Sequence, residues 1–316
     1  MRLALSVATV LVALFALPAL AETTLTVGKA SPTSDAIIPV NVGNELGIFK
    51  KHGLDLQIVE LGGGSKMAQA VAAGSVDIGD GAGTEMAFVA KGAPMIAVCE
   101  TTGPAPFLAV GVPWDSPIKT LDELKGKKIG VSNSGSFSDW SARQLARKKG
   151  WGENGVTTVA IGSGVAAVGA ALKTHQIDAM VTGTNVFLAF EEKQEGHLLA
   201  PVSTWEGNVA SGALYASHDV IAKHPDAVRA FLAGWIETVD YMRAHKAETV
   251  KIEAALTHFD EQVMSREYDL VIGMFTKACR FDAESLAALK SSFRDLKLVE
   301  GEPDMSKLYT HAYLPK

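Results

Sequence analysis

Short apolar runs of strand type alternate with segments of helical periodicity as far as about residue 217. Apolar runs such as 54–61, 95–100, 107–112 and 177–183 lie next to helix-like segments such as 135–150. Strands that alternate with helices of about 10–15 residues are typical of βαβ units and a largely parallel sheet. The pattern therefore predicts an α/β fold.

After residue 218 the periodicity becomes purely helical. Four consecutive segments have a helical pattern, and each opens near a Pro, Asp or Glu: 225–245, 247–259, 261–279 and 282–296. Four helices in a row cannot belong to an alternating sheet, so we expect them to cover a lobe built from earlier parts of the chain. Near the other end, a single helix is predicted over 36–51. It should begin near residues 36–38, because Pro39 is tolerated only in a first turn.

One pattern of glycines, apolar residues and an aspartate occurs twice. Residues 61–84 align without a gap with residues 162–185, at an offset of 101. This offset is too long for a solenoid repeat and indicates two similar lobes. Turn residues cluster at 111–117 and 203–212, where we expect the chain to cross between lobes. The predicted organisation is a signal peptide at 1–21, a first lobe made of 22–112 and 206–316, and a second lobe at 113–205.

The first 21 residues have the pattern of a cleavable export signal. Arg2 precedes the apolar run 3–17, and Ala19-Leu20-Ala21 has the small-x-small form of a cleavage site. The alternative, a membrane anchor, is disfavoured by hydroxyl residues within the run and by the cleavage motif. Glu22 follows the site where a lipid-anchored protein would have a cysteine. We therefore expect secretion to the periplasm, with the signal peptide removed.

Charge and cysteine content narrow the range of partners. The net charge is −6 at pH 7 with dispersed lysines and arginines, so we expect no binding to nucleic acid. Cys99 and Cys279 lie in apolar surroundings, and in an exported protein they could form a disulfide or remain buried thiols. Their spacing fits no zinc or redox motif, and we expect neither a metal nor a cofactor. We also expect a monomer.

Two glycine-rich loops follow predicted strands at equivalent places in the repeat. The loops are 62–65 and 162–164, and each leads into a helix. Ligands of open parallel sheets bind beyond the carboxyl ends of the strands, where the first N–H groups of the next helix are unpaired. Two such loops facing each other would grip one small molecule. Their spacing matches neither a Walker loop nor a dinucleotide motif, and a tight turn alone is the remaining alternative.

Three other loops at strand ends carry polar residues: 30–35, 81–85 and 133–139. In each, helix capping competes with ligand binding as an explanation. In the first loop, residue 34 or 35 would cap the next helix. In the second, the acidic residue at position 85 would suit the first turn of a helix. In the third, an S-x-x-D capping box opens at Ser136. The remaining hydroxyl and aromatic side chains are free to contact a ligand.

Three segments together resemble a known family. Residues 47–94, 115–139 and 224–235 are similar to the periplasmic solute-binding proteins of bacterial ABC importers of the nitrate, sulfonate and taurine type. The resemblance implies a bilobed periplasmic-binding-protein fold of type II, in which two α/β lobes are joined by two crossovers and a solute lies in the cleft between them. It also implies that the closed protein delivers a small-molecule solute to an ABC permease in the inner membrane.

The resemblance and the loops together nominate a set of ligand-binding residues: Ser31, Thr33, Asp35, Gly64, Ser65, Thr84, Glu85, Ser134, Ser136, Phe137, Ser138, Gly164, Thr184, Asn185 and Trp205. Glu85 departs from the family pattern, which favours a small or apolar residue there, and "TGTNVF" replaces an aromatic residue and a proline. Carboxylates outnumber the nearby cations, which argues against a strongly anionic solute. We expect a small amphipathic organic molecule.

An enzyme is the alternative from a different class. A related branch of the fold makes the pyrimidine of thiamine, using a cysteine-rich iron motif and a donor histidine. This chain has two distant cysteines, its eight histidines lie outside the nominated loops, and neither G-x-S-x-G nor H-E-x-x-H occurs. We predict a binding protein without catalytic residues; the alternative is a pyrimidine-precursor-related binding protein or enzyme of the same branch.

Overall fold

The computed structural model describes residues 22–34, 36–295 and 297–315. The predicted signal peptide and the nominated ligand residue Asp35 lie outside the described residues. No helix within the described ranges is long and apolar enough to cross a membrane.

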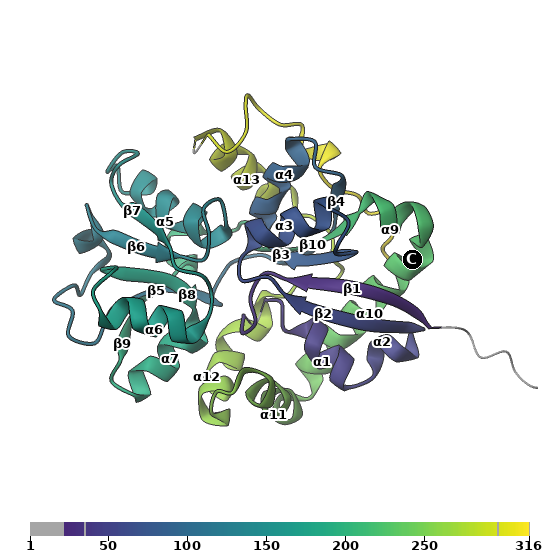
Figure 1. The fold of residues 1–316 in the computed structure, drawn as a ribbon, viewed down its shortest axis with the longest axis horizontal. Helices are drawn as coiled ribbons and strands as arrows, with labels where there is room; N and C mark the ends of the chain where they lie inside the picture. The colour runs from purple at the N-terminus through teal and green to yellow at the C-terminus, as the bar shows by residue number, and fades with distance from the viewer. Residues whose placement is uncertain (1–21, 35, 296, 316) are drawn as a thin grey trace, which may run out of the picture.

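Two five-stranded sheets form the centres of two α/β lobes, as predicted (Figure 1). The first sheet has the order β2-β1-β3-β10-β4, with β1 (Thr23–Lys29), β2 (Leu54–Glu60), β3 (Ile78–Gly81), β10 (Gly212–Ser217) and β4 (Met95–Thr102). The second has the order β7-β6-β8-β5-β9, with β7 (Thr157–Ala160), β6 (Lys128–Val131), β8 (Ala179–Gly183), β5 (Leu108–Pro113) and β9 (Gly196–Pro201). In each sheet the first three strands are parallel, and the fourth strand is antiparallel to its neighbours.

The sequence repeat corresponds to equivalent elements in the two lobes. Helix α3 (Gly64–Ala72) follows β2 and precedes β3, and helix α6 (Val165–Lys173) follows β7 and precedes β8. Both helices begin after a glycine of the repeat, Gly63 in the first lobe and Gly164 in the second. The offset of 101 residues therefore relates the starts of two helices that occupy the same place relative to their sheets.

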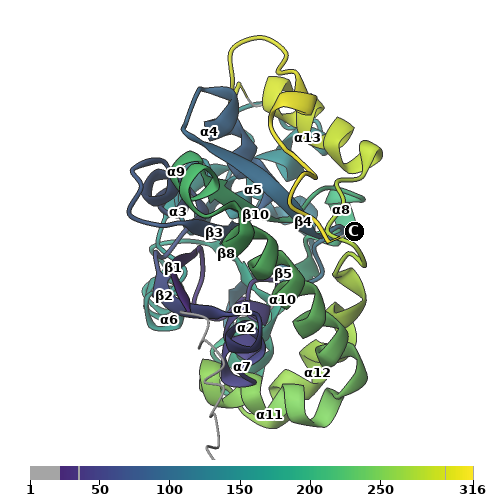
Figure 2. The same ribbon diagram turned by 90° about the vertical axis from the view of Figure 1, so that its right-hand side faces the viewer.

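The other helices cover the faces of the sheets and the junction between lobes. Their bounds are α1 (Pro39–Glu45), α2 (Ile48–Lys51), α4 (Met86–Ala90), α5 (Phe137–Lys148), α7 (Thr184–Glu192), α8 (Ser203–Glu206), α9 (His218–Lys223), α10 (Pro225–Ala244), α11 (Lys246–Thr257), α12 (Glu261–Val271) and α13 (Ala283–Asp295). The long helix α10 lies against α1 and α2, as Figure 2 shows. Four single-turn 3₁₀ segments complete the described elements: Gly83–Glu85, Leu121–Leu124, Ile272–Met274 and Met305–Lys307.

The single helix predicted over 36–51 is wrong in two respects. The segment forms two short helices, and the first begins at Pro39 rather than at 36–38. The break falls at Gly47, whose φ of 69° is left-handed and cannot continue a right-handed helix. Apolar periodicity on both sides of Gly47 concealed this break.

The chain passes between the sheets twice. The first passage lies between β4 and β5, at residues 103–107, and the second lies between β9 and β10, at residues 202–211. Strand β5 falls inside the first lobe as we predicted its bounds, yet it pairs with β8 and β9 of the second sheet. The first lobe boundary therefore belongs before Leu108 rather than after residue 112. The apolar strand 107–112 gave no sign of which sheet it would join.

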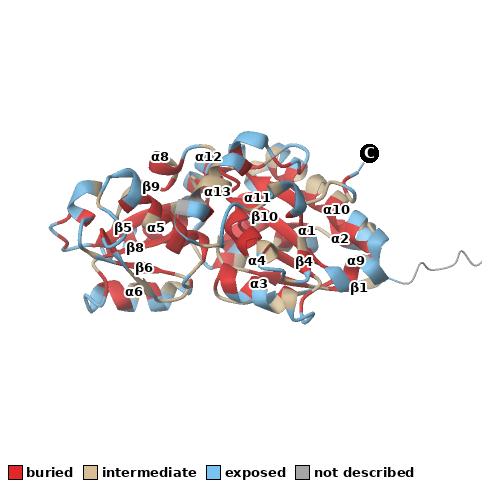
Figure 3. Ribbon diagram, turned by 90° about the horizontal axis from the view of Figure 1, so that it is seen from above, coloured by how far each residue is buried: buried red, intermediate tan, exposed pale blue. Residues whose placement is uncertain are grey.

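Buried residues concentrate in the strands of both sheets and in the helix faces that pack on them (Figure 3). A smaller cluster links the lobes, because Leu188 and Ala189 of α7 pack against Val263 of α12. Cys99 on β4 and Cys279, which precedes α13, form a disulfide, the pairing that the sequence left open. The disulfide joins the edge strand of the first sheet to the C-terminal segment.

Candidate functional site

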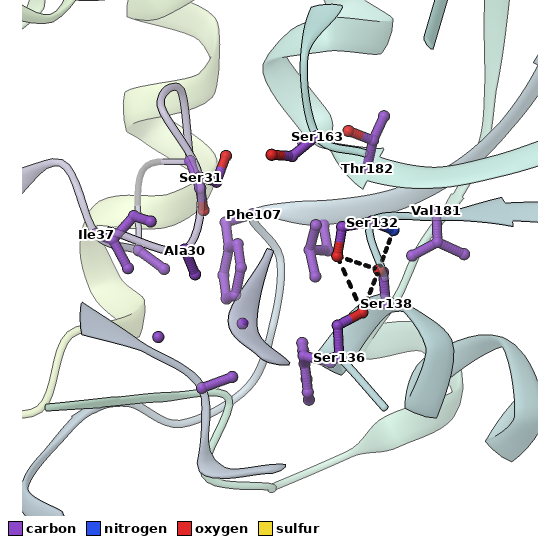
Figure 4. Close-up of a pocket in the computed structure, with 18 of the residues that line it drawn as sticks. Ala30, Ser31, Ile37, Phe107, Ser132, Ser136, Ser138, Ser163, Val181 and Thr182 are labelled. Atoms are coloured by element: carbon purple, nitrogen blue, oxygen red, sulfur yellow. Dashed lines mark hydrogen bonds between the residues drawn. The ribbon is translucent and has the colours of Figure 1, made fainter. Parts of the chain in front are cut away.

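A pocket lies between the two sheets and has walls from both lobes (Figure 4). It contains about 620 Å³ of space not filled by atoms, counting the part open to solvent. The first lobe contributes Ala30, Ser31, Ser34, Ala36, Ile37, Gly64, Gly81, Ala82, Glu85 and Ser211. The first chain passage and the second lobe contribute Phe107, Leu108, Ser132, Ser136, Phe137, Ser138, Ser163, Met180, Val181, Thr182 and Gly183. The composition is that of a small-molecule site, which is largely apolar with a few convergent polar groups.

The two glycine-rich loops of the repeat meet at this pocket. Gly64 of the first loop and Ser163 of the second both line it. The loops lie beyond the carboxyl ends of β2 and β7, which is the edge of an open parallel sheet where ligands bind. Their convergence on one pocket is the arrangement that the repeat predicted.

Glu85 is the charged residue of the first-lobe wall. It is fully buried at the end of the 3₁₀ turn after β3, and its Oε2 accepts a hydrogen bond of 2.7 Å from the Ala82 amide. Its Oε1 has no hydrogen-bond partner within the described part of the chain, and it lies against Gly64, where an added Cβ would come within 1.9 Å of it. Burial raises the pKa of Glu85 to about 7, although the Ala82 amide acts in the opposite direction. This carboxyl therefore changes charge near neutral pH.

A second pair of ionisable groups lies beside the pocket at the ends of the central strands. Lys29 on β1 and Asp80 on β3 are register partners, and both side chains are buried. Burial lowers the pKa of Lys29 and raises the pKa of Asp80, while each charge partly offsets the shift of the other. The Lys29 amino group also donates to the Pro32 carbonyl at 3.3 Å, which ties it to the loop that carries Ser31 and Ser34.

Three serines form the polar wall of the second lobe, at the start of α5. The Ser132 hydroxyl donates to Ser136 Oγ at 2.9 Å, and Ser138 Oγ accepts from the Ser132 amide at 2.9 Å (Figure 4). Ser136 also caps α5 by accepting from the Asp139 amide, and Asp139 accepts from the Gly135 amide, so the predicted capping box is present in modified form. The three serines therefore orient one another through these hydrogen bonds.

Aromatic side chains form the apolar side of the pocket. Phe107 and Phe137 are stacked with their ring centroids 6.4 Å apart, and both are almost fully buried. Phe107 lies on the first chain passage and Phe137 opens α5, so this surface belongs to the junction between the lobes. A flat apolar group of a ligand would pack against it.

Direct contacts join the two lobes next to the pocket. The Ser65 hydroxyl of α3 donates to the Ser134 carbonyl at 2.8 Å, and the Asn185 amide nitrogen of α7 donates to the Thr33 carbonyl at 2.7 Å. Gly63 lies so close to the second lobe that an added Cβ would come within 1.4 Å of Asn133 Oδ1. Loops of the two lobes therefore touch beside the pocket.

Six of the nominated residues line the pocket: Ser31, Gly64, Glu85, Ser136, Phe137 and Ser138. Thr33, Ser65, Ser134 and Asn185 lie outside the lining and form the contacts between lobes described above. Thr84 is buried behind the wall, Gly164 precedes α6, Thr184 donates to the Pro106 carbonyl at 2.7 Å, and the Trp205 indole donates to the Ser141 carbonyl at 3.1 Å. The ligand-binding role of all these residues stays a prediction.

Several residues that line the pocket were not nominated from the sequence. Phe107 ends the passage between sheets and Leu108 begins β5, where the sequence shows only an apolar run after prolines. Met180, Val181 and Thr182 lie within β8, whereas our search considered the loops that follow strands. Ser163 stood inside the second glycine-rich loop and could have been chosen from the repeat. The strand positions carried no usable signal, because side chains at the end of a buried strand are apolar whether or not they contact a ligand.

The pocket wall carries no histidine or cysteine among the residues that the structure describes there. Within the same described ranges, no group of three or more His, Cys, Asp or Glu side chains could hold a metal ion. Both cysteines are engaged in the disulfide. The arrangement offers hydroxyls, backbone groups, one carboxyl and apolar surface.

Comparisons with known proteins identify the family of this chain and other proteins with a similar fold. The family model described as NMT1/THI5 like matches residues 35–249, which is more than half of the chain. The chain belongs to the NMT1/THI5-like family. Its lobes also resemble the alkanesulfonate-binding protein SsuA of Xanthomonas axonopodis, with a TM-score of 0.78 at 18% identity, covering 91% of this chain and 98% of that one. The resemblance to solute-binding proteins seen in the sequence is thus confirmed for the family and the fold.

Two curated relatives show that the NMT1/THI5-like family includes different roles. A Brucella abortus protein that carries a binding-protein name is 26% identical over 228 residues, covering 72% of this chain and 69% of the relative. The Saccharomyces cerevisiae 4-amino-5-hydroxymethyl-2-methylpyrimidine phosphate synthase THI5 is 27% identical over 307 residues, covering 88% and 84%. Membership of the NMT1/THI5-like family therefore leaves both binding and synthesis open.

Proposed function

We propose that this protein is the extracytoplasmic solute-binding component of an ABC importer. It captures a small organic solute between its lobes and delivers it to a permease in the inner membrane. The observation that carries the proposal is the pocket whose walls come from both lobes and whose rim is joined by Ser65–Ser134 and Asn185–Thr33 hydrogen bonds. A solute that contacts both walls binds the closed form more tightly than the open form, and this difference drives closure.

The disulfide supports the extracytoplasmic location. Cys99 and Cys279 are buried and bonded to each other, and disulfides persist in oxidising compartments such as the periplasm. The export signal expected at residues 1–21 agrees with this location. The protein acts as a monomer, since one chain supplies both walls of the pocket.

Synthesis is the second candidate, and the relative THI5 is the observation that favours it. The pocket of this chain offers no histidine or cysteine in its described wall, whereas the synthase branch is expected to use a donor histidine and a cysteine-rich motif. The wall residues suit binding and orientation. We therefore favour capture without chemical change.

Small-angle scattering and mass spectrometry of the mature protein test the proposal. Native mass spectrometry identifies a solute that copurifies with the protein, and the same solute is then added back to the emptied protein. We expect the radius of gyration to decrease on binding and the solute to be recovered unchanged. Unchanged dimensions at saturation, or recovery of a chemically altered solute, would overturn the proposal.

A further inference from the structure

The carboxyl of Glu85 lies in the first-lobe wall of the pocket, next to the start of helix α3. Helix α3 begins at Gly64, and its first N–H groups point toward the pocket end of the helix, where the helix dipole favours a negative charge. Glu85 Oε1 lies against Gly64 at this end. The protein's own carboxyl therefore lies beside the first residue of α3, although no N–H of this helix donates to its Oε1.

The geometry leaves one oxygen of this carboxyl for a ligand. Oε2 is held by the Ala82 amide at 2.7 Å, whereas Oε1 is fully buried and has no hydrogen-bond partner within the described ranges. A buried polar atom without a partner costs about 1–3 kcal/mol, and more when it is charged. A ligand that donates a hydrogen bond to Oε1 removes this cost as it binds.

The rest of the wall offers no compensating positive charge. Among the described lining residues Glu85 is the charged one, and the others are small, hydroxyl-bearing, aliphatic or aromatic. Lys29 does not line the pocket; burial lowers its pKa, and its amino group donates to the Pro32 carbonyl. At pH 8, above the pKa of about 7 that burial gives Glu85, an oxyanion entering the pocket would meet a carboxylate without a lysine or arginine among the described lining residues to balance it.

We infer that the pocket takes an uncharged or cationic solute that carries an N–H donor for Glu85 and a flat apolar body for the Phe107–Phe137 surface. Amines, amidines and primary amides on a small ring have this chemistry, whereas sulfonates, carboxylates and nitrate do not. The inference rests on the proposed function and names the class of solute that it captures. It separates this chain from the alkanesulfonate-binding protein that shares its fold.

Four probes with the same ring test this inference: benzylamine, benzamide, benzoate and benzenesulfonate. Thermal unfolding is followed at equal probe concentration, and dissociation constants are measured by calorimetry for the probes that raise Tm. We expect benzylamine or benzamide to raise Tm, and benzoate and benzenesulfonate to leave it unchanged. The Glu85→Gln variant should bind benzylamine at least about tenfold more weakly, because the ammonium then bonds a neutral amide oxygen in place of a carboxylate.

The matched control is Glu100→Gln. Glu100 is also buried, and burial likewise raises its pKa to about 7, but it bonds the Asp282 amide and the Ser285 hydroxyl away from the pocket. Its substitution should leave probe affinity unchanged. Should Glu85→Gln fail to fold, the comparison of the four probes on the unsubstituted protein decides alone.

Three results would overturn the inference: an oxyanion probe that stabilises the protein as much as its N–H counterpart, no stabilisation by either N–H donor, or equal benzylamine affinity in Glu85→Gln. These outcomes are distinct from failure of the proposed function. An oxyanion that binds and compacts the protein would overturn the inference and leave the capture role intact. Chemical alteration of a bound N–H donor would do the reverse.

Discussion

Removing the disulfide between Cys99 and Cys279 should destabilise the first lobe substantially. The paired cysteines are 180 residues apart in the chain, and both are buried. A cross-link limits the conformations of the unfolded chain, and the loss on removing it grows with the logarithm of the loop length. For a fully unfolded loop of this length the chain-entropy relation gives about 5 kcal/mol at 25 °C.

The loop closed by the disulfide contains the whole second lobe, and this changes the expected loss of stability only slightly. If the second lobe stays folded while the first unfolds, roughly 90 residues of the loop remain flexible, and the same relation gives about 4.6 kcal/mol. At about 2–4 °C per kcal/mol, the expected decrease in Tm is roughly 10 °C or more for the first-lobe transition. The second lobe should be affected little, because neither cysteine belongs to it.

The assay is thermal unfolding of the Cys99→Ala/Cys279→Ala variant beside the unsubstituted protein, each with and without reductant. Reductant should lower the Tm of the unsubstituted protein toward that of the variant, and it should leave the variant unchanged. A decrease below about 2 °C in the variant would refute the reasoning. So would an equal shift of both transitions in calorimetry, since the effect is assigned to one lobe.

Three further predictions concern closure and pH. Gly63→Ala should block the closed form, because an added Cβ collides with the second lobe and the φ of 151° is unfavourable for alanine. The control Gly164→Ala, at the equivalent position of the repeat, should close normally. Small-angle scattering with bound solute measures closure in both variants. Removing the contacts between lobes with Ser65→Ala and Asn185→Ala should weaken the closed form, so that saturating solute reduces the radius of gyration less than in the unsubstituted protein; equal compaction would contradict the assigned contacts. Burial raises the pKa of Glu100 to about 7 from its ordinary 4.5, so the folded protein holds a proton that the unfolded chain releases. Stability from this group is therefore lost as pH rises from 5 to 8, and Glu100→Gln should flatten the decline of Tm over that range.

The architecture could be predicted because its signals are local and repeated. The strand and helix periodicities, and the recurrence of one pattern at an offset of 101 residues, identify two α/β lobes, and α3 and α6 occupy equivalent places. The membership of β5 could not be predicted, because an apolar strand of six residues fits either sheet and tertiary pairing alone decides. The break at Gly47 likewise depends on a left-handed backbone that apolar periodicity does not reveal.

The pocket was predictable where loops follow parallel strands, and less so elsewhere. Ser31, Glu85 and Ser136 were found because polar residues at strand ends are unusual enough to draw notice. Asn185 was nominated for a ligand, yet its side chain bonds the Thr33 carbonyl across the lobes. A sequence shows that a polar side chain is near the cleft, but the choice between ligand and opposite lobe depends on distances set by the whole fold.

The insertion of β10 between β3 and β4 determines the order in which the protein can assemble. All strands of the second sheet lie within residues 108–201. The first sheet, in contrast, is complete only when residues 212–217 have been added as β10. Until they arrive, β3 and β4 each keep an unpaired edge that can join a neighbouring molecule. The segment 23–102, which carries β1 to β4, is therefore the part of the chain most exposed to aggregation during synthesis until β10 is added.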